Sequence, residues 1–211
     1  MLIDRLVTGP FQENSYLVAA GRGRPCVLID PGDEAGRIAD RIGELDLSPE
    51  LILNTHGHLD HIGAVADLQE RYGIPFALHP ADRFLVTGVN EQARMFGLHG
   101  YRDPTVDRDL VAGESVHAAG LDFRILHTPG HSPGHVALSL GAIVFGGDCL
   151  FQGSIGRSDL PGSDPEALHR TLHEVFLAMA DMTVIHPGHG PSTTIGAERR
   201  SNPFLTGAIR W

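Results

Sequence analysis

The stretch LILNTHGHLDHIG, from Leu51 to Gly63, places potential metal ligands close together in the chain. These ligands are His56, His58, Asp60 and His61. The apolar residues before them predict a buried strand, and the pattern after them is typical of a helix. A solvated polar loop would explain the polarity but not the repeated histidine, and HxHxDH should arise by chance in roughly 4 of 1,000 chains of this composition. The stretch therefore indicates a metal site.

The spacing of these four ligands predicts two ions rather than one. His56 and His58 lie two residues apart, so in an extended segment their side chains point the same way and can bind one ion. Asp60 and His61 lie where the chain turns into the helix, so they need not share that direction. Asp60 at a helix start also gains from the positive end of the helix dipole. Ligands that face two directions suit two adjacent ions.

Three residues far along the chain are candidates for the remaining ligands. His131 lies in HTPGHSPGH, Asp148 ends IVFGGD, and His189 lies in IHPGHG. Each follows a predicted strand in a turn rich in proline or glycine, where a rigid sheet can deliver a side chain into a shared cleft. Taken alone, an aspartate in such a turn is more often a turn or capping residue. Together with the histidine cluster, Asp148 is interpreted as a ligand.

The composition excludes several classes of protein. With 211 residues the chain can bury a full core, and no linker interrupts it, so we expect one domain over 1–211. A net charge of −10 without a basic block disfavours nucleic-acid binding. No apolar run is long enough for a membrane span, and the first residues lack the apolar core of a signal peptide. Two cysteines make no disulfide framework. We expect a cytoplasmic monomer or homodimer with a small-molecule substrate.

The order of predicted elements favours an α+β fold. Strands are predicted over 2–9, 15–21, 25–32, 49–55, 74–79, 114–120, 121–128, 135–141, 142–148 and 182–188. Helices are predicted over 33–45, 62–72, 163–179 and 194–200, with two short helices within 81–99. Strands come in runs and are followed by helices in each half, which favours two packed sheets with helices outside over a strictly alternating parallel sheet.

The motifs THGHLDH, TPGHSPGH, FGGD and PGHG, in this order, resemble the metallo-β-lactamase superfamily over almost the whole chain. The segments GPFQENSYLV, IDPG, GDCLFQGSIGRSDLPG and ERRSNPFL are similar to its glyoxalase II-like branch of small single-domain hydrolases. The resemblance implies an αββα sandwich, with two mixed sheets, helices on both outer faces and metals at one edge of the sheets. The C-terminal helical domain of larger glyoxalases II is not expected here.

The resemblance also implies a ligand set for two divalent ions, with zinc expected first and iron or manganese as alternatives. His56, His58 and His131 would bind the first ion. Asp60, His61 and His189 would bind the second ion, and Asp148 would bridge both. His135, four residues after His131, is expected to support the site from outside the ligand set. Cys149 beside Asp148 is interpreted as a small packed residue, because free cysteine is usually buried and inert.

Two ions in such a site can generate a bridging hydroxide near neutral pH and polarise a substrate carbonyl. Asp60, close to the hydroxide, would orient it. Glyoxalases II hydrolyse S-acylglutathione thioesters, and by resemblance Arg157 in SIGRSD would bind a substrate carboxylate. A structural salt bridge between Arg157 and Asp159 is the alternative. The resemblance thus implies a metal-dependent thioester hydrolase.

Other functions fit the same motifs. A persulfide (sulfur) dioxygenase of the same fold uses a single Fe(II), bound by the equivalents of His56, His131 and Asp148. The loop SIGRSDLPG favours the hydrolase. A lactonase or β-lactamase is a further alternative. A metal-binding module without turnover is disfavoured, because structural zinc sites are closed and usually rich in cysteine.

Overall fold

The computed structural model describes residues 1–209, and two six-stranded sheets form its centre. The first sheet has the spatial order β1 (Leu2–Thr8), β2 (Glu13–Ala19), β3 (Pro25–Ile29), β4 (Ser48–Leu53), β5 (Phe76–Leu78) and β6 (Arg108–Asp109). The second has the order β14 (Thr193–Thr194), β13 (Val184–Pro187), β10 (Ile143–Gly147), β9 (Val136–Leu140), β8 (Leu121–His127) and β7 (Ser115–Ala118). Each sheet is mixed, because parallel pairs such as β3–β4 and β10–β13 lie beside antiparallel ones.

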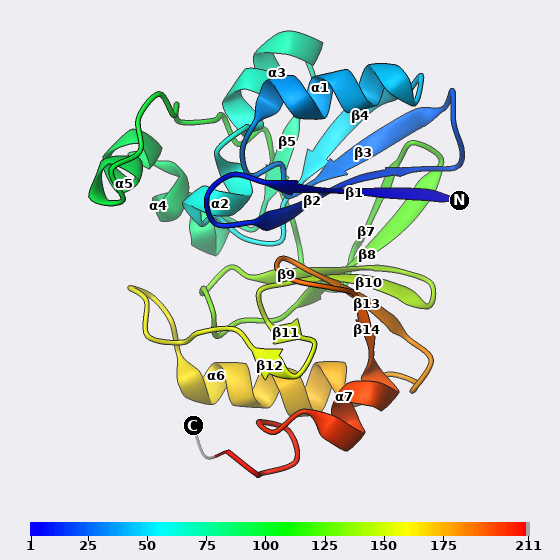
Figure 1. The fold of residues 1–211 in the computed structure, drawn as a ribbon, viewed down its shortest axis with the longest axis vertical. Coiled ribbons are helices and arrows are strands. Elements are labelled where there is room, and N and C mark those ends of the chain that lie inside the picture. Colours follow the sequence, from blue (N-terminus) through cyan, green and yellow to red (C-terminus); the bar gives the residue numbers. More distant parts are fainter. Residues whose placement is uncertain (210–211) are drawn as a thin grey trace.

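Helices lie on the outer sides of the two sheets (Figure 1). One side carries α1 (Ala35–Glu44) and α3 (Val65–Tyr72), and the other carries α6 (Pro165–Arg170), its π-helical continuation η2 (Thr171–Phe176) and α7 (Ile195–Ser201). The remaining elements are α2 (Leu59–Ile62), η1 (Pro80–Asp82), α4 (Arg83–Val86), α5 (Val89–Met95) and the small hairpin of β11 (Leu150–Phe151) and β12 (Ser154–Ile155). The predicted αββα sandwich of two mixed sheets is confirmed.

Strand β3 shows how the layers are held together. Val27 and Ile29 are buried between the sheets in one cluster with Phe145 of the second sheet. The alternate residues Cys26 and Leu28 are buried in the cluster that the helices of the first side complete. Successive side chains of a strand point to opposite faces. The run CVLI is therefore apolar throughout because the strand is covered on both faces.

The start of the helix predicted over 62–72 was wrong, because α3 begins at Val65 and Ile62 is the last residue of a separate short helix, α2. The chain passes very close to the first sheet at the junction. A Cβ atom on Gly63 would lie 2.3 Å from the carbonyl oxygen of Gly32. The backbone N–H of Ala64 donates to the carbonyl oxygen of Pro31 at 3.1 Å. This tertiary contact separates α2, which carries two predicted ligands, from the longer α3.

Other elements differ from the prediction where they are short. Strands β6, β11, β12 and β14 contain two residues each, which is too few for a periodic signal.

The helix predicted over 163–179 begins as expected, with Pro165 in its first turn and the side chain of Asp164 accepting from the N–H of Ala167 at 3.0 Å. It ends at Phe176 as a π-helical turn. Helices α4 and α5 are the two short helices expected within 81–99.

The predicted ligands follow strands of both sheets. The segment after β4 carries the histidine cluster, and the segments after β8, β10 and β13 carry His131, Asp148 and His189. Among residues 1–209, no helix combines the length and the apolar character that crossing a membrane requires.

Candidate metal centre

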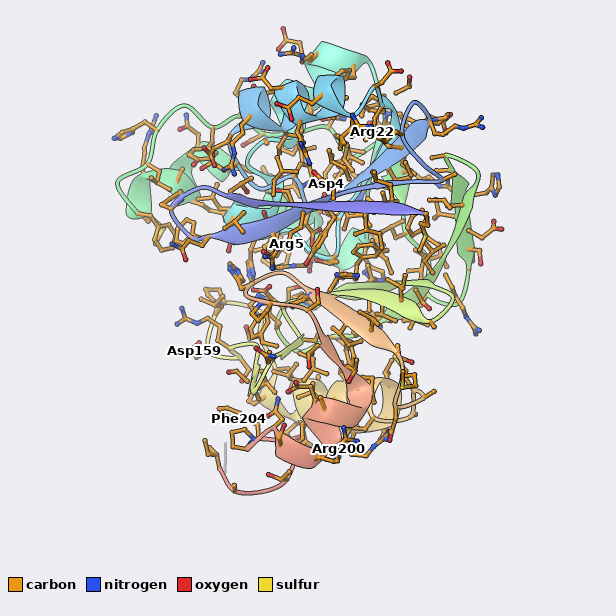
Figure 2. All side chains as sticks on the ribbon, turned by 45° about the vertical axis from the view of Figure 1, so that its right-hand side comes forward. Asp4, Arg5, Arg22, Asp159, Arg200 and Phe204 are labelled. Atoms are coloured by element: carbon orange, nitrogen blue, oxygen red, sulfur yellow. The ribbon has the colours of Figure 1, made fainter. Side chains whose placement is uncertain are left out.

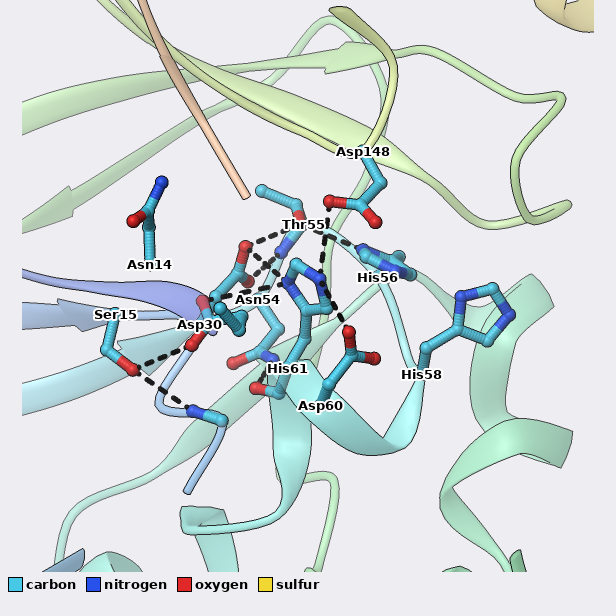
Figure 3. A network of polar contacts seen from close by, with 12 residues as sticks. Asn14, Ser15, Asp30, Asn54, Thr55, His56, His58, Asp60, His61 and Asp148 are labelled. Atoms are coloured by element: carbon cyan, nitrogen blue, oxygen red, sulfur yellow. Dashed lines mark hydrogen bonds and ion pairs between the residues drawn. The ribbon is translucent and has the colours of Figure 1, made fainter. Parts of the chain in front are cut away.

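The seven predicted ligands converge at one place between the two sheets. Figure 3 shows five of them, His56, His58, Asp60, His61 and Asp148. Their nitrogen and oxygen atoms fall into three overlapping sets, each with all atoms within 4.8 Å of one another: His56, His58 and His131; His56, His61 and Asp148; and Asp60, His61 and His189. Residues that are up to 133 positions apart in the sequence therefore present donor atoms to a common centre.

The carboxylate of Asp148 lies between the histidines of both halves. Its Oδ1 is 3.3 Å from His61 Nε2, and its Oδ2 is 3.6 Å from His131 Nε2 and 3.5 Å from His189 Nε2. Asp60 Oδ2 lies 3.2 Å from His189 Nε2 on the other side of the centre. The Asp148 carboxylate therefore approaches histidines from both ligand sets, whereas the Asp60 carboxylate approaches His61 and His189 of its own set.

Several nitrogen and oxygen atoms that could bind a metal ion are buried at the centre without a hydrogen-bond partner. His56 Nε2, His61 Nε2 and Asp148 Oδ1 are such atoms. A buried polar atom left unsatisfied costs about 1–3 kcal/mol, so three at one point require an explanation. A cation bound between them supplies it, and imidazole nitrogens with carboxylate oxygens suit zinc and iron. The residues present fit a metal centre.

The protonation states of two ligands of the first set suit metal binding directly. Burial, together with the neighbouring His61, holds the pKa of His56 well below its usual value. Burial and His131 lower the pKa of His58 to about 4. Both imidazoles are therefore neutral at pH 7, which is the form that binds a metal ion.

In the second set, burial disfavours charged imidazoles, but Asp148 and Asp60 outweigh it and raise the pKa of His61, and they raise that of His189 to about 10, so these imidazoles must release a proton when they bind an ion. Burial alone would raise the pKa of Asp148, but the histidines led by His61 outweigh it and keep the pKa well below its usual range.

His61 is oriented by residues that the sequence motifs did not reveal. Its Nδ1 lies 3.1 Å from Asp30 Oδ2, and since a carboxylate only accepts, Nδ1 carries the proton and Nε2 faces the centre. Asp30 also accepts from the backbone N–H and the hydroxyl of Thr55, at 2.6 and 2.7 Å. The side chain of Asn54 donates to the carbonyl oxygen of His61 at 2.6 Å. The segment IDPG after β3 was the available signal for Asp30.

Behind Asp30 lies a second buried carboxylate, Glu13, that sequence reasoning missed. The hydroxyls of Thr8 and Ser15 donate to its Oε2 at 3.0 and 2.9 Å. Its Oε1 has no hydrogen-bond partner and lies 3.9 Å from His61 Nδ1. Burial raises the pKa of Glu13 well above its usual value. Protonation of Glu13 would remove its own negative charge beside the Asp30 carboxylate.

His135 belongs to none of the three ligand sets and hydrogen-bonds to the backbone of Asp148. Its Nε2 accepts from the backbone N–H of Asp148 at 3.0 Å, so its proton sits on Nδ1, which lies 2.8 Å from the hydroxyl oxygen of Thr128. Both ring nitrogens are thereby used, and burial lowers the pKa of His135 well below its usual value. The neighbouring Cys149 is buried, with its thiol donating to the carbonyl oxygen of Thr128 at 3.3 Å.

Arg157 takes part in the site through its backbone. Its carbonyl oxygen accepts from His131 Nδ1 at 2.8 Å, which leaves His131 Nε2 to face the centre. Its guanidinium makes two hydrogen bonds to Asp159, at 2.6 and 2.9 Å, so the salt bridge raised as an alternative is present. Both side chains are more than half exposed, and Figure 2 shows Asp159 at the edge of the molecule.

Comparison with known proteins agrees with this geometry. The family model described as the Metallo-beta-lactamase superfamily matches residues 8–193. The chain is 41% identical to the hydroxyacylglutathione hydrolase GloC of Haemophilus influenzae over 214 aligned positions, which cover 97% of this chain and 98% of that protein.

Solved structures agree with the fold along almost the whole chain. A crystal structure of TTHA1623 in a di-iron-bound form has a TM-score of 0.87 and 48% identity, covering 96% of this chain and 100% of that one. A crystal structure of the B3 metallo-beta-lactamase BLEG-1 has a TM-score of 0.88 and 37% identity, covering 98% and 100%. The chain described here belongs to the metallo-β-lactamase superfamily.

Proposed function

We propose that this protein is a dinuclear metal-dependent hydrolase that cleaves thioesters. The observation that carries the proposal is the convergence of seven nitrogen and oxygen ligands, three of which leave buried donor atoms without a hydrogen-bond partner. The 41% identity to a hydroxyacylglutathione hydrolase supports a thioester as the substrate.

In this proposal His56, His58 and His131 would hold the first ion, and Asp60, His61 and His189 would hold the second. Asp148 would serve both, because its two oxygens approach histidines of both sets. Zinc suits these donors. The di-iron form of TTHA1623 makes iron the first alternative, with manganese behind it.

When bound, two ions would ionise a water molecule near neutral pH and polarise the substrate carbonyl. The chain's own residues orient these partners. Asp60 is proposed to accept a hydrogen bond from the attacking water, since its Oδ2 lies at the centre, 3.2 Å from His189 Nε2 and 3.9 Å from His61 Nε2. The thiolate released from a thioester needs little protonation, so no separate general acid is required. The thiol of Cys149 is buried and its pKa is raised by that burial, so it has no role as a nucleophile.

Arg157 is proposed to bind a carboxylate of the substrate by exchanging it for Asp159. The existing pair is exposed and therefore inexpensive to open. Arg157→Ala should raise KM for a thioester that carries a carboxylate about tenfold and leave KM for a neutral thioester unchanged. Equal effects on both substrates would show that Arg157 does not bind the carboxylate.

A persulfide dioxygenase with a single iron remains the competing function. It would use His56, His131 and Asp148 and leave the second ligand set without a purpose. The likeness to BLEG-1 makes β-lactam hydrolysis a third activity to assay.

The test is metal analysis followed by a substrate panel. Protein purified without added metal should bind two ions per chain and hydrolyse a hydroxyacylglutathione thioester. One iron per chain with oxygen uptake on glutathione persulfide would establish the dioxygenase instead. Cleavage of a chromogenic β-lactam without thioester hydrolysis would identify a lactamase.

A further inference from the structure

Each ligand set combines loops from both halves of the chain, and these loops must be held at a fixed separation. His56 and His58 come from the first half, whereas His131 comes from the second. In the other set, Asp60 and His61 are joined by His189. Two fully buried polar side chains of the first half, Asp82 and Asn14, reach across to the ligand loops of the second half.

Asp82 ties together the two loops of the first ligand set. Its Oδ2 accepts from the backbone N–H of Gly57 at 3.1 Å, between His56 and His58. The same carboxylate accepts from the hydroxyl of Ser132 at 2.6 Å and from the backbone N–H of Gly134 at 2.6 Å, directly after His131. The side chain is completely buried. One carboxylate thus links loops that are 73 residues apart at their ligands.

The approach of Asp82 explains two glycines of the motifs. A Cβ atom on Gly134 would lie 2.7 Å from the Asp82 carboxylate, although Cβ atoms essentially never come within 3.0 Å of another heavy atom. A Cβ atom on Gly57 would lie 3.1 Å from the Asp82 carbonyl oxygen. Gly134 thus leaves room for the Asp82 side chain, and Gly57 leaves room for the Asp82 backbone and for Leu85, whose Cβ would lie 3.0 Å away. The contact is therefore built into the motifs THGHLDH and TPGHSPGH.

Asn14 holds the turn that carries His189. Its side-chain amide donates to the carbonyl oxygens of Pro187 and Gly190, at 2.9 and 2.8 Å, on either side of the ligand. Its backbone N–H donates to the carbonyl oxygen of Gly188 at 2.7 Å. Asn14 is 1% exposed. The turn is thereby fixed to strand β2 of the opposite sheet, where the segment GPFQENSYLV ends.

We propose that Asp82 and Asn14 are positioning residues, each responsible for one metal subsite. Asp82 sets the first ligand set, and Asn14 sets the second. The inference rests on the proposed dinuclear function. Neither side chain contacts the other's loop in the hydrogen bonds described, so the two subsites should respond to substitution separately. Substituting a group that orients a metal ligand typically weakens metal affinity 10–100-fold.

The test measures metal affinity directly, by competition with a chromogenic chelator and by metal content per chain. Asp82→Asn should weaken one ion 10–100-fold, because at least one N–H or O–H donor then faces an amide group. Asn14→Ala should weaken the other ion to the same extent. Asp107→Asn is the control for a change of Asp to Asn at a distance from the ligands, since the exposed Asp107 also accepts from a backbone N–H, that of Phe76. Asn202→Ala is the control for Asn14, because that buried amide also donates to a backbone carbonyl.

Ligand variants identify which ion is weakened. On a His189→Ala background, Asn14→Ala should not weaken the remaining ion further, whereas on a His58→Ala background it should weaken the remaining ion 10–100-fold. Asp82→Asn should show the opposite pattern. If Asp82→Asn does not fold, Ser132→Ala replaces it, since it removes one hydrogen bond to the Asp82 carboxylate. If Asn14→Ala does not fold, Tyr16→Phe replaces it, since the Tyr16 hydroxyl donates at 2.7 Å to the same Pro187 carbonyl oxygen that Asn14 contacts.

The outcomes separate the two proposals. If wild-type protein binds two ions and hydrolyses thioesters, but both variants weaken both ions equally or neither ion at all, only the assignment of Asp82 and Asn14 to separate subsites is overturned. If wild-type protein does not bind two ions, the dinuclear function is overturned, and the assignment of Asp82 and Asn14 is overturned with it. Selective loss in the predicted pattern establishes both residues as positioning residues.

Discussion

Gly188 lies where any side chain would collide with the bridging carboxylate. A Cβ atom at this position would be 2.1 Å from Asp148 Oδ1 and 2.6 Å from His61 Cε1. Gly188 is not among the residues with positive φ, so alanine is compatible with its backbone. Gly188→Ala therefore perturbs the metal centre without imposing backbone strain.

The size of the effect follows from this overlap. Cβ atoms essentially never approach other heavy atoms closer than 3.0 Å, so Asp148 Oδ1 must move by about 1 Å. A displacement of about 1 Å in a catalytic centre costs about 100-fold in rate. At about 1.36 kcal/mol for each tenfold change, this corresponds to about 2.7 kcal/mol of lost transition-state stabilisation.

The assay compares kcat/KM for thioester hydrolysis and the number of bound ions in wild type and Gly188→Ala. The matched control is Gly43→Ala in α1, where a Cβ atom meets nothing within 4 Å. That control should keep full activity and gain up to about 1 kcal/mol of stability from helix propensity. Two tightly bound ions and kcat/KM within threefold of wild type in Gly188→Ala would refute the placement of Asp148 at the centre.

Three further predictions concern thiols, pH and metal. Burial raises the pKa of Cys26 to about 12 and that of Cys149 further, so neither thiol should react with a disulfide reagent until the protein unfolds, and rapid native labelling would contradict this. Burial and then Arg5 lower the pKa of His186, so the unfolded chain binds a proton that the folded protein excludes. The free energy of unfolding, measured with urea, should therefore fall as pH drops below about 6.5. It should fall less steeply in His186→Phe, and an equal slope in both proteins would contradict this. Chelation should lower the free energy of unfolding by about 2.7 kcal/mol for each ion whose free concentration was 100 times its Kd, and an unchanged melting temperature would argue against bound metal.

The layered fold and the ligand candidates could be predicted because their signals are local. The two-residue spacing of His56 and His58 and the apolar run before them depend on the period of an extended chain. The apolar segment CVLI predicts a strand covered on both faces. Such patterns need no knowledge of what packs against them. The order of these elements favoured two packed sheets with helices outside, the resemblance to the superfamily implied the αββα sandwich, and the structure confirms it.

The two-residue strands and the break between α2 and α3 could not be predicted in this way. Strands of two residues have no periodicity, and they exist because a neighbouring strand supplies their hydrogen bonds. The break at Gly63 arises because the chain meets the carbonyl oxygen of Gly32, which a helical pattern does not report.

The sequence by itself determined which side chains could bind metal and which predicted strand each of them follows. Only the tertiary structure decided what holds them in place. Asp30 and Asn14 lie in the segments IDPG and GPFQENSYLV, and Asp82 lies in no quoted segment. None of the three could be assigned a role from the sequence, because their partners lie 25 to 176 residues away. A buried hydrogen bond depends on which loops meet across the two sheets, and that meeting is a property of the packed chain rather than of any short segment.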